Sequence, residues 1–410
     1  MELKPGYRQT EVGVIPKDWD VSSVGEKGQV VAGKALAVNA PGKQRPYLRT
    51  KNVFDGHIDI EDVLSMPMTD EQFAQFQLRH GDVLLNEGQS LELVGRCSIY
   101  KGEYPESCAI QNALLRFRAN TGTSAVFASH LFRHCQQTGI FAKIALQTTS
   151  VAHLGSSRFA NLKLAWPTEN EQRLIAAALD ELDALLSSLD AAITKKTSLK
   201  QAAMQELLTG KRRLPGFVGE WEVKRLGDVF LIMAGKSKSA FIVASGDHLI
   251  VDMGSVSTQG RLIASKQTNY QGDFLQVGDL IMPKDDIGGG GIIGKVAYVD
   301  DKSKYVLGDH VYCLRAIVGD SRFLVHVINS FPINRDLRKK VIGSAQLGLG
   351  RQSVINQEIP FPPQAEQAAI ASLLSEIDAE IISLEKQLKK VSNLKQGMMQ
   401  QLLSGRIRLQ

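Results

Sequence analysis

The stretch that decides the fold occurs twice in the chain. Residues 171–210 read EQRLIAAALDELDALLSSLDAAITKKTSLKQAAMQELLTG, and residues 366–405 read EQAAIASLLSEIDAEIISLEKQLKKVSNLKQGMMQQLLSG. With a constant shift of 195 and no gap, 21 of the 44 positions in 171–214 are identical to those in 366–409. A match of this density over an ungapped stretch indicates an internal duplication.

Each copy predicts one long helix with an apolar seam. Apolar residues recur at alternating spacings of four and three from Ile370 to Leu402, and in the same registers from Ile175 to Leu207. Lysines interrupt the seams: Lys196 and Lys200 in the first copy, Lys395 in the second. A seam of this period over nearly five heptads is typical of a coiled coil, and plain core packing or oligomerisation is the structural alternative.

The segments before the helices repeat more loosely. The corresponding pieces are Gly81-Asp82 with Gly278-Asp279, Val94-Gly95-Arg96 with Ile293-Gly294-Lys295, and Leu115-Arg116 with Leu314-Arg315. Short β-type runs between Gly and Asp turns predict an α/β globule in each half. We therefore predict a first domain over 1–167, a helix over 168–210, a second domain over 211–362 and a helix over 363–410. The expected fold class is mixed α/β, with two long antiparallel helices forming an intramolecular coiled coil and a pseudo-two-fold repeat.

Composition sets only broad limits. The 410 residues include 48 Lys and Arg against 43 Asp and Glu, so the net charge of +5 permits a nucleic-acid partner without requiring one. The four cysteines show no CxxC spacing, which favours reduced thiols. No stretch of 18 apolar residues and no apolar leader occur, so we expect a cytoplasmic protein without a membrane partner.

The segments at the boundaries of the two predicted helices resemble those of a known protein family. Residues 166–172 read WPTENEQ and 361–367 read FPPQAEQ, while the helices end in QELLTG at 205–210 and QQLLSG at 400–405. The chain opens with GVIPKDW at 13–19. This layout resembles the specificity (S) subunits of Type I restriction–modification systems over essentially the whole chain.

The resemblance implies a non-catalytic reader of double-stranded DNA. Each globule would read one half of a split target, and the helices would act as spacer and dock for two methyltransferase (M) subunits, joined by restriction (R) subunits. Two readers at the ends of a rod fit half-sites about one helical turn, roughly 34 Å, apart. No cofactor is expected on this chain; S-adenosylmethionine, ATP and Mg²⁺ would belong to the partner subunits. At the helix boundaries we assign partner docking to Glu171, Gln172, Glu366 and Gln367.

Candidate DNA contacts are polar and basic residues in loops, because phosphates take Lys and Arg while base edges take Arg, Lys, Asn and Gln. For each of them, an ordinary solvated charge is the alternative. In the first domain they are Arg49, Lys51, Asn52, Gln89, Arg96 and Arg158, and in the second Lys236, Lys238, Lys284, Lys295, Arg351 and Gln352.

Other motifs are weaker. Residues 289–295 match GxxxxGK, but Val296 replaces the Ser or Thr that would hold Mg²⁺, so a nucleotide-binding ATPase is the least favoured function. His130 and His134 stand four apart without an evident third metal ligand, and we predict no metal site and no catalytic residues. The main alternative function is a coiled-coil scaffold whose globules bind protein.

Overall fold

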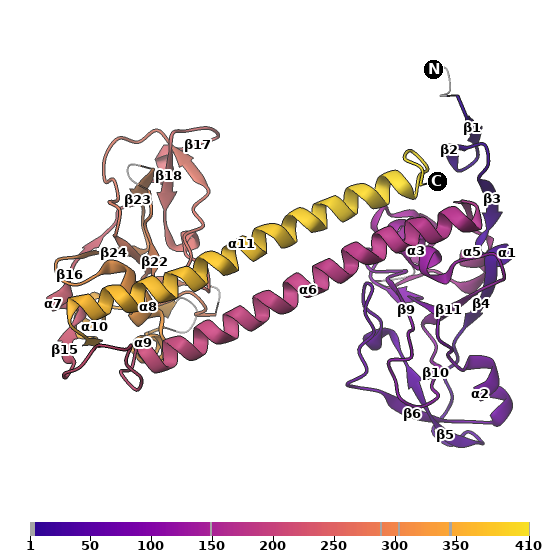
Figure 1. Cartoon of the computed structure of the whole chain (residues 1–410), viewed down its shortest axis with the longest axis horizontal. Helices are drawn as coiled ribbons and strands as arrows, with labels where there is room; N and C mark the ends of the chain where they lie inside the picture. The colour runs from indigo at the N-terminus through magenta and orange to yellow at the C-terminus, as the bar shows by residue number, and fades with distance from the viewer. Residues whose placement is uncertain (1–4, 148–149, 288, 302–303, 344–346, 410) are drawn as a thin grey trace. The chain divides into compact units, whose positions relative to one another are not determined.

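The computed structural model describes residues 5–147, 150–287, 289–301, 304–343 and 347–409, which form two compact units. Unit 1 contains Met1–Ser188 and Gln387–Gln410, and unit 2 contains Leu189–Lys386. The two long helices, α6 (Glu169–Leu207) and α11 (Gln364–Leu402), are each shared between the units (Figure 1). Each unit is therefore built from a globule and parts of both helices, rather than from a globule alone.

The central sheet of unit 1 has four antiparallel strands in the order β4-β11-β7-β9. These strands are β4 (Gly28–Ala32), β11 (Leu114–Ala119), β7 (Val83–Asn86) and β9 (Cys97–Ile99). Two smaller sheets have three strands each: β10 (Ala109–Ile110), β5 (Lys43–Leu48) and β6 (Leu64–Met68) in one, and β12 (Leu146–Gln147), β13 (Ala152–His153) and β8 (Gly88–Gln89) in the other. Two more sheets have two strands each: β14 (Lys163–Trp166) with β3 (Asp20–Ser23), and β1 (Tyr7–Thr10) with β2 (Gly13–Pro16).

Unit 2 repeats this plan with the order β16-β24-β20-β22. These strands are β16 (Phe230–Ala234), β24 (Val311–Ala316), β20 (Leu280–Pro283) and β22 (Ala297–Tyr298). A second four-stranded sheet contains β17 (Ile242–Val243), β19 (Lys266–Thr268), β18 (His248–Val251) and β23 (Tyr305–Leu307). Two sheets have two strands each: β21 (Asp285–Asp286) with β25 (Leu347–Gly348), and β15 (Glu222–Arg225) with β26 (Glu358–Phe361).

Strand register corrects one detail of the predicted repeat. Phe117 pairs with Val83 in unit 1, and Leu314 pairs with Leu280 in unit 2. The partner of Leu314-Arg315 is therefore Phe117-Arg118, two residues beyond the pair matched from the sequence. Side chains alternate between the two faces of a strand, so a match displaced by two residues still aligns residues that point to the same face. The hydrophobic pattern therefore did not reveal the error.

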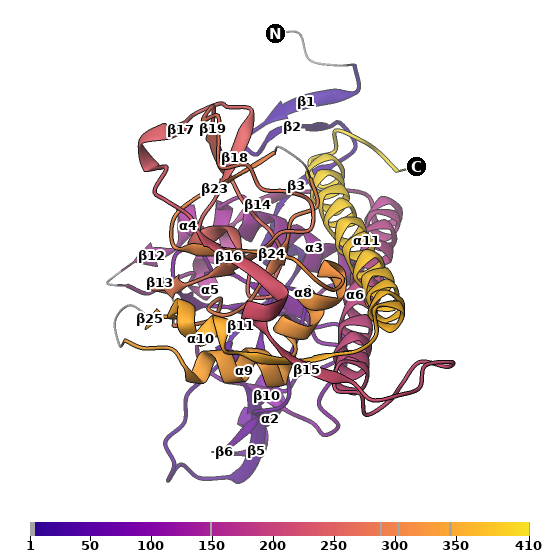
Figure 2. The ribbon, with the colours of Figure 1, turned by 90° about the vertical axis from the view of Figure 1, so that its left-hand side faces the viewer.

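Short helices complete both units. Unit 1 has α1 (Val24–Lys27), α2 (Asp70–Phe76), α3 (Ala125–Gln137), α4 (Ile140–Ile144), α5 (Ser156–Asn161) and the 3-10 turn η1 (Thr50–Asn52). Unit 2 has α7 (Leu226–Val229), α8 (Ser321–Asn329), α9 (Phe331–Lys339), α10 (Arg351–Ile355), η2 (Ser239–Phe241) and η3 (Met253–Ser255). Within unit 2, β17, β18 and β19 gather at one side, away from α9 and α10 (Figure 2). No helix among the described residues has the length and apolarity needed to cross a membrane.

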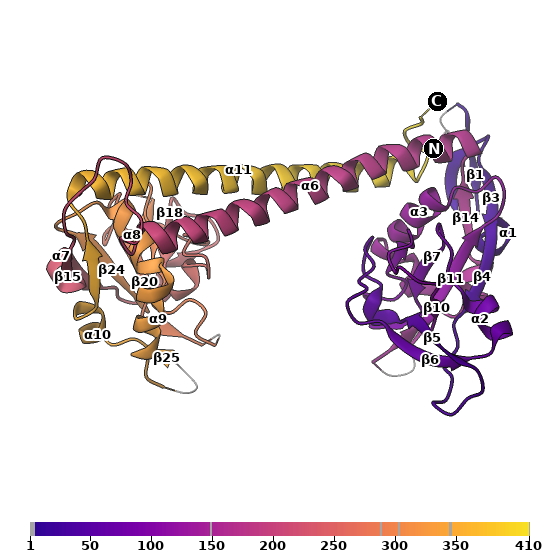
Figure 3. The same ribbon diagram turned by 60° about the horizontal axis from the view of Figure 1, so that its bottom comes forward.

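One helix of each globule joins the central sheet to the helix pair. In unit 2, Phe323 and Val327 of α8 share a buried cluster with Leu280 and Leu314 of the sheet and with Leu374 of α11 (Figure 3). The cluster of unit 1 has the same make-up: Phe127 and Leu131 of α3, Val83 and Leu115 of the sheet, and Leu179 of α6. In each unit this cluster packs the sheet and one helix against the helix pair, and a second cluster holds other strand residues, such as Leu84 in unit 1 and Ile281 in unit 2.

The predicted seams meet within each unit. In unit 1, Ile175 and Leu179 near the start of α6 share a core with Met399 and Leu402 near the end of α11. In unit 2, Leu207 at the end of α6 packs in one core with Ile370 near the start of α11. The beginning of one helix thus lies beside the end of the other, which is antiparallel pairing within a single chain. This confirms the predicted fold class.

Candidate functional site

The lysines that interrupt the seams are ion pairs. Lys200 on α6 places its Nζ 2.6 and 2.7 Å from the two carboxylate oxygens of Asp378 on α11. In unit 1, Lys395 on α11 pairs with Asp183 on α6. Both lysines and both aspartates are related by the 195-residue repeat, so each unit holds the same pair between the same two helices. A polar pair inside an apolar seam favours one register over its neighbours.

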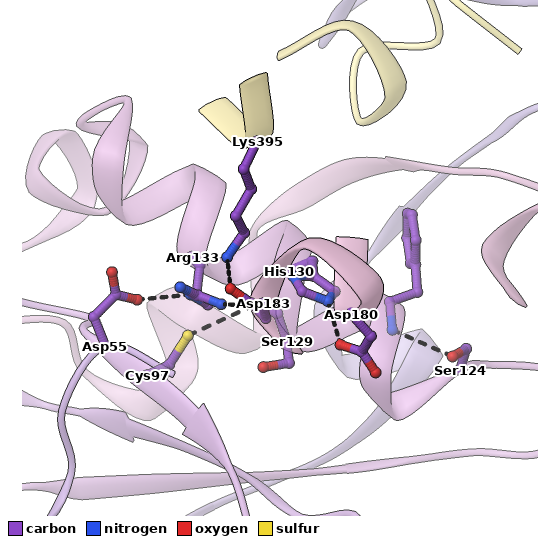
Figure 4. Close-up of polar contacts among 10 residues, drawn as sticks. Asp55, Cys97, Ser124, Ser129, His130, Arg133, Asp180, Asp183 and Lys395 are labelled. Carbon is purple, nitrogen blue, oxygen red and sulfur yellow. Dashed lines mark hydrogen bonds and ion pairs between the residues drawn. The ribbon is translucent and has the colours of Figure 1, made fainter. Parts of the chain in front are cut away.

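In unit 1 this pair belongs to a larger cluster around Arg133 of α3 (Figure 4). The Arg133 guanidinium donates to Asp55 Oδ1 at 2.7 Å and to Asp183 Oδ2 at 3.0 Å. Burial alone would raise the pKa of Asp183, but the Lys395 ammonium and Arg133 outweigh it and hold that pKa below its usual range. Three segments, the loop at Asp55, α3 and the helix pair, are therefore joined through one guanidinium.

A histidine lies at the edge of the same cluster. His130 is buried, and its Nε2 lies 2.9 Å from Asp180 Oδ1 (Figure 4). The ligand atoms of His130, Asp180 and Asp183 all lie within 4.8 Å of one another, close enough to hold a metal ion. Both oxygens of Asp183 already face cations, and a divalent ion would have to displace Lys395 and Arg133. The contacts therefore favour an ion-pair cluster that fixes α3 to the helices.

A second repeated feature is a set of hydrogen bonds at the start of each long helix. We call it the Trp–Glu–Arg clasp: Trp19, Glu171 and Arg408 in unit 1, and Trp221, Glu366 and Arg213 in unit 2. Trp19 Nε1 donates to Glu171 at 2.9 Å, and Arg408 donates to both oxygens of the same carboxylate at 2.7 and 2.8 Å. In unit 2 the indole distance is 3.0 Å, and Arg213 Nη2 donates to Glu366 at 2.6 Å.

The four residues predicted to dock a partner, Glu171, Gln172, Glu366 and Gln367, make contacts inside the units. All four side chains are buried, Glu366 completely. The two glutamines hold backbone groups: Gln172 bonds Ser124 N and Pro167 O, and Gln367 bonds Asp320 N and Pro362 O. These polar atoms are used inside the unit. The residues mark the helix starts, as expected, and their docking of a partner stays a prediction.

Two predicted DNA readers are also structural. Asn52 is 2% exposed, and its amide donates to the carbonyl oxygens of Asp59 and Asp62 at 2.9 and 3.1 Å. Lys238 is 5% exposed and pairs with Asp273 at 2.8 Å. A base reader needs a free edge on the surface, and neither side chain presents one in this structure.

Other predicted readers lie nearer the surface, and several of them have partners. Arg49 and Lys51 both pair with Asp62, at 2.6 and 2.7 Å. The guanidinium of Arg96 stacks over the Phe54 ring at 4.8 Å. Lys236 and Gln352 are exposed, and Lys295 donates weakly to Asn329 O at 3.3 Å. These residues are therefore available to DNA to different degrees, with Lys236 and Gln352 the freest.

The structure brings predicted residues together at one equivalent place in each unit. In unit 1, Gln89 on β8 pairs with Ala152, and Arg158 in α5 donates to His153 O and Leu154 O. In unit 2, the backbone carbonyl of Lys284 accepts a hydrogen bond from Leu349 N at 2.7 Å, next to Arg351 at the start of α10. Each group joins the end of a central strand to the short helix that precedes the last strand.

Sequence reasoning missed the neighbours of these groups. Ala113 and His310, which directly precede β11 and β24, have φ angles of 64° and 62°. Non-glycine residues in this region carry backbone strain, which is often retained at functional sites. Beside them, His153 lies 3.2 Å from Glu87 and His310 lies 2.7 Å from Asp285. Nothing in the sequence predicts a positive φ at an alanine, so only the tertiary structure shows the strained residues that precede β11 and β24.

Comparison with known proteins identifies the repeated unit. A family model described as the Type I restriction modification DNA specificity domain matches residues 16–199 and again 219–393. The chain belongs to this family. Its two matches coincide with the two copies of the sheet and helix plan, which confirms the family resemblance.

Relatives and solved structures align with nearly the whole chain. The Type I restriction enzyme MjaVIII specificity subunit of Methanocaldococcus jannaschii is 23% identical, over 96% of this chain and 94% of the relative. The solved S subunit of a Type I restriction–modification system from M. genitalium is 15% identical, covers 98% of both chains and has a TM-score of 0.63. A second solved chain, from a Type I system described for its complex assembly and conformational transition, is 15% identical with a TM-score of 0.56 and covers 96% of this chain and 99% of its own.

Proposed function

We propose that this family member is the DNA-reading subunit of a Type I restriction–modification enzyme and reads a bipartite target, one half through each unit. The observation that carries the proposal is the presence of two specificity domains on one chain, at 16–199 and 219–393. The domains keep the same strand order while their loops differ, which is what two readers of different half-sites require.

The partners follow from the same proposal. Two methyltransferase subunits would dock on the helices and carry out adenine methylation, and restriction subunits would complete the enzyme in the cytoplasm. This chain would supply no catalytic group of its own, and S-adenosylmethionine, ATP and Mg²⁺ would bind to the partners. The internal repeat supports two copies of the methyltransferase, because each unit contains the same pairing of one helix start with one helix end.

The base-reading surface would include the strand-end groups. In unit 1 the group contains Gln89 and Arg158, and in unit 2 it contains Lys284 and Arg351. Gln89 offers an amide, Lys284 an ammonium, and Arg158 and Arg351 the guanidinium donors that their backbone contacts leave free; such groups recognise adenine and guanine edges in the major groove. Their equivalent placement supports one reading geometry used twice on different sequences.

The test is a domain exchange scored by sequencing of methylated bases. The segment 16–167 is replaced by that of a relative, and the chimera is expressed with the methyltransferase subunit. We expect one half of the methylated motif to change and the other to persist; exchange of 219–362 should do the reverse. A scaffold protein would leave the motif intact in both chimeras, and that result would refute the proposal.

A further inference from the structure

A large cleft in unit 2 carries excess positive charge. Its volume is about 1720 Å³, and it lies between the helix pair, α8, α9 and the loop at 258–262. Two of its cations are neutralised at its wall, Lys200 by Asp378 and Arg261 by Glu385. One further carboxylate, Asp300, lines the cleft, against six more basic side chains: Lys211, Lys295, Arg322, Arg335, Arg338 and Lys339. Asp336 makes only long contacts with Arg335 and Lys339, at 3.4 and 3.6 Å.

The cations sit close enough to repel one another. Burial lowers the pKa of Lys295, and the nearby charges of Arg338 and Lys200 lower it further. A like-charge group of this kind is stabilised when an anion enters it, because the anion offsets the repulsion among the cations. The cleft therefore favours a negatively charged ligand.

An unsatisfied donor lies buried in the wall of the cleft. Asn334 of α9 is 5% exposed, and its Nδ2 has no hydrogen-bond partner among the described residues. A buried amide donor without an acceptor is unfavourable, so such groups are rare in folded proteins. Asn334 lines the cleft, so this unused amide donor belongs to the wall of the cleft.

The glycine-rich loop allows close approach to these donors. Gly290 and Gly294 have φ angles of +81° and +72°, a backbone region open to glycine. A Cβ on Gly294 would lie 3.4 Å from Asn334 Nδ2 and 3.2 Å from Leu337 Cβ. The run at 289–294 thus lets the backbone pack against α9 beside Lys295, where a larger residue would crowd the amide donor.

The corresponding place in unit 1 is chemically different. There Arg133 occupies the α3 position equivalent to Asn329 of α8, counted from the shared Phe127 and Phe323. Its guanidinium is already bound by Asp55 and Asp183. In the cleft of unit 2, by contrast, neither Lys295 nor Arg338 forms an ion pair with a carboxylate of the described residues. At this position, therefore, unit 2 has cations without carboxylate partners, whereas unit 1 does not.

We propose that this cleft binds phosphates of the DNA backbone, through Lys295, Arg338 and the Asn334 amide. The proposal rests on the DNA-reading function given above and adds a contact that positions the duplex without reading its sequence. A free nucleotide offers the same phosphate chemistry, but the GxxxxGK run lacks the hydroxyl that would hold Mg²⁺, since Val296 follows Lys295.

The experiment measures the salt dependence of duplex binding by the full chain. Fluorescence anisotropy is recorded from about 50 to 200 mM salt for the wild type, Arg338→Gln, Asn334→Asp and a control, Arg225→Gln. Arg225 is exposed in the same unit and does not line the cleft. We expect Arg338→Gln to reduce the slope of log K against log salt by about 0.9 for each phosphate that the variant no longer binds, equally on target and unrelated duplexes.

Asn334→Asp separates this site from a general charge effect. The new carboxylate would repel a phosphate in the cleft, so binding should weaken at every salt concentration, while Arg225→Gln retains the wild-type slope. Far-UV circular dichroism and the urea midpoint verify that each variant is folded. If both cleft variants bind DNA with the slope of the control, the cleft does not contact the backbone and the proposal is overturned.

Two further outcomes have separate meanings. If the wild type binds no duplex even at about 50 mM salt, the DNA-reading function itself fails, whatever the cleft does. Calorimetric titration with inorganic phosphate and with ATP distinguishes the other source of phosphate. Saturable micromolar binding of either one, abolished in Arg338→Gln while the DNA slope is unchanged, would replace the DNA backbone by a small phosphate ligand.

Discussion

Lys200 Nζ lies 2.6 and 2.7 Å from the two oxygens of Asp378, and the repeat places Lys395 and Asp183 in the same relation in unit 1. The residues that weaken the apolar seams in the sequence are thus the residues that specify their pairing. A shift of one helix along the other would leave an ammonium facing apolar side chains.

Breaking the seam pair from one side should destabilise the protein more than removing both charges. Asp378→Leu leaves the Lys200 ammonium without its carboxylate, and we expect a loss of about 2–3 kcal/mol, reduced from the fully buried case because both side chains remain partly exposed. Lys200→Leu with Asp378→Leu should recover most of it. Urea denaturation measures the free energy of unfolding.

The more exposed pair Lys196–Glu380 serves as the control for this cycle. Lys196→Leu should cost less than about 1 kcal/mol, the usual range for surface pairs. A double variant as unstable as Asp378→Leu alone would show that the charges contribute stability, and that their role is not confined to specifying the register.

The Trp–Glu–Arg clasp should be a point of stability rather than of partner affinity. Glu366→Gln removes the charge that Arg213 and Trp221 share, and the expected loss is about 1.5–3 kcal/mol, as for hydrogen bonds to a charged group. Glu385→Gln, at a half-exposed pair with Arg261, is the matched control and should cost less. Thermal unfolding checks stability, and co-purification with the methyltransferase checks docking. An unchanged melting temperature with abolished docking would restore the original docking interpretation.

Unit 2 should lose stability in mild acid through His326. This histidine is 7% exposed, and burial, aided by the Lys200 charge, lowers its pKa from 6.5 to about 4. Between about pH 6.5 and pH 4 the unfolded chain binds the proton and the folded chain does not, so stability falls as the pH falls through this window. The contribution is up to about 3 kcal/mol.

Urea denaturation at several pH values tests the histidine directly. His326→Gln should flatten the pH dependence over this window relative to the wild type, because carboxylate contributions are common to both proteins. His80→Gln, at an exposed histidine, should leave it unchanged. Equal pH profiles for all three proteins would contradict the assignment.

The strand-end groups should act on one half-site each. Arg351→Ala is expected to weaken binding about 10- to 100-fold and to relax preference in one half of the target only, the range for removal of a good base contact. Arg158→Ala should do the same in the other half. Selection of bound sequences from a random duplex pool reports both halves. Relaxation of both halves by a single variant would contradict one-unit, one-half-site reading.

Much of the fold was predictable because it depends on local and periodic patterns. The seam from Ile175 to Leu207 and its copy predicted two long helices, and α6 and α11 have the same length of 39 residues. The turn at Gly81-Asp82 predicted the entry to β7, and Gly278-Asp279 the entry to β20. Periodicity survives in the sequence because it follows from helix and strand geometry alone.

The candidate site was less predictable, since the availability of a side chain depends on distant partners. Nothing near Lys238 in the sequence indicates that Asp273 binds it, and nothing near Asn52 shows that its amide holds the loop at Asp59. The same holds for Glu366, which looks like a surface residue at a helix start but lies beneath Arg213 and Trp221.

The sequence by itself determined the duplication, the two helices, the α/β character of each half and the family. Only the tertiary structure decided which charges are free. Lys200 and Asp378 are 178 residues apart and Lys395 and Asp183 are 212 apart, so their pairing exists only after the two helices meet. Secondary structure follows from neighbours along the chain, whereas the state of a charge follows from neighbours in space.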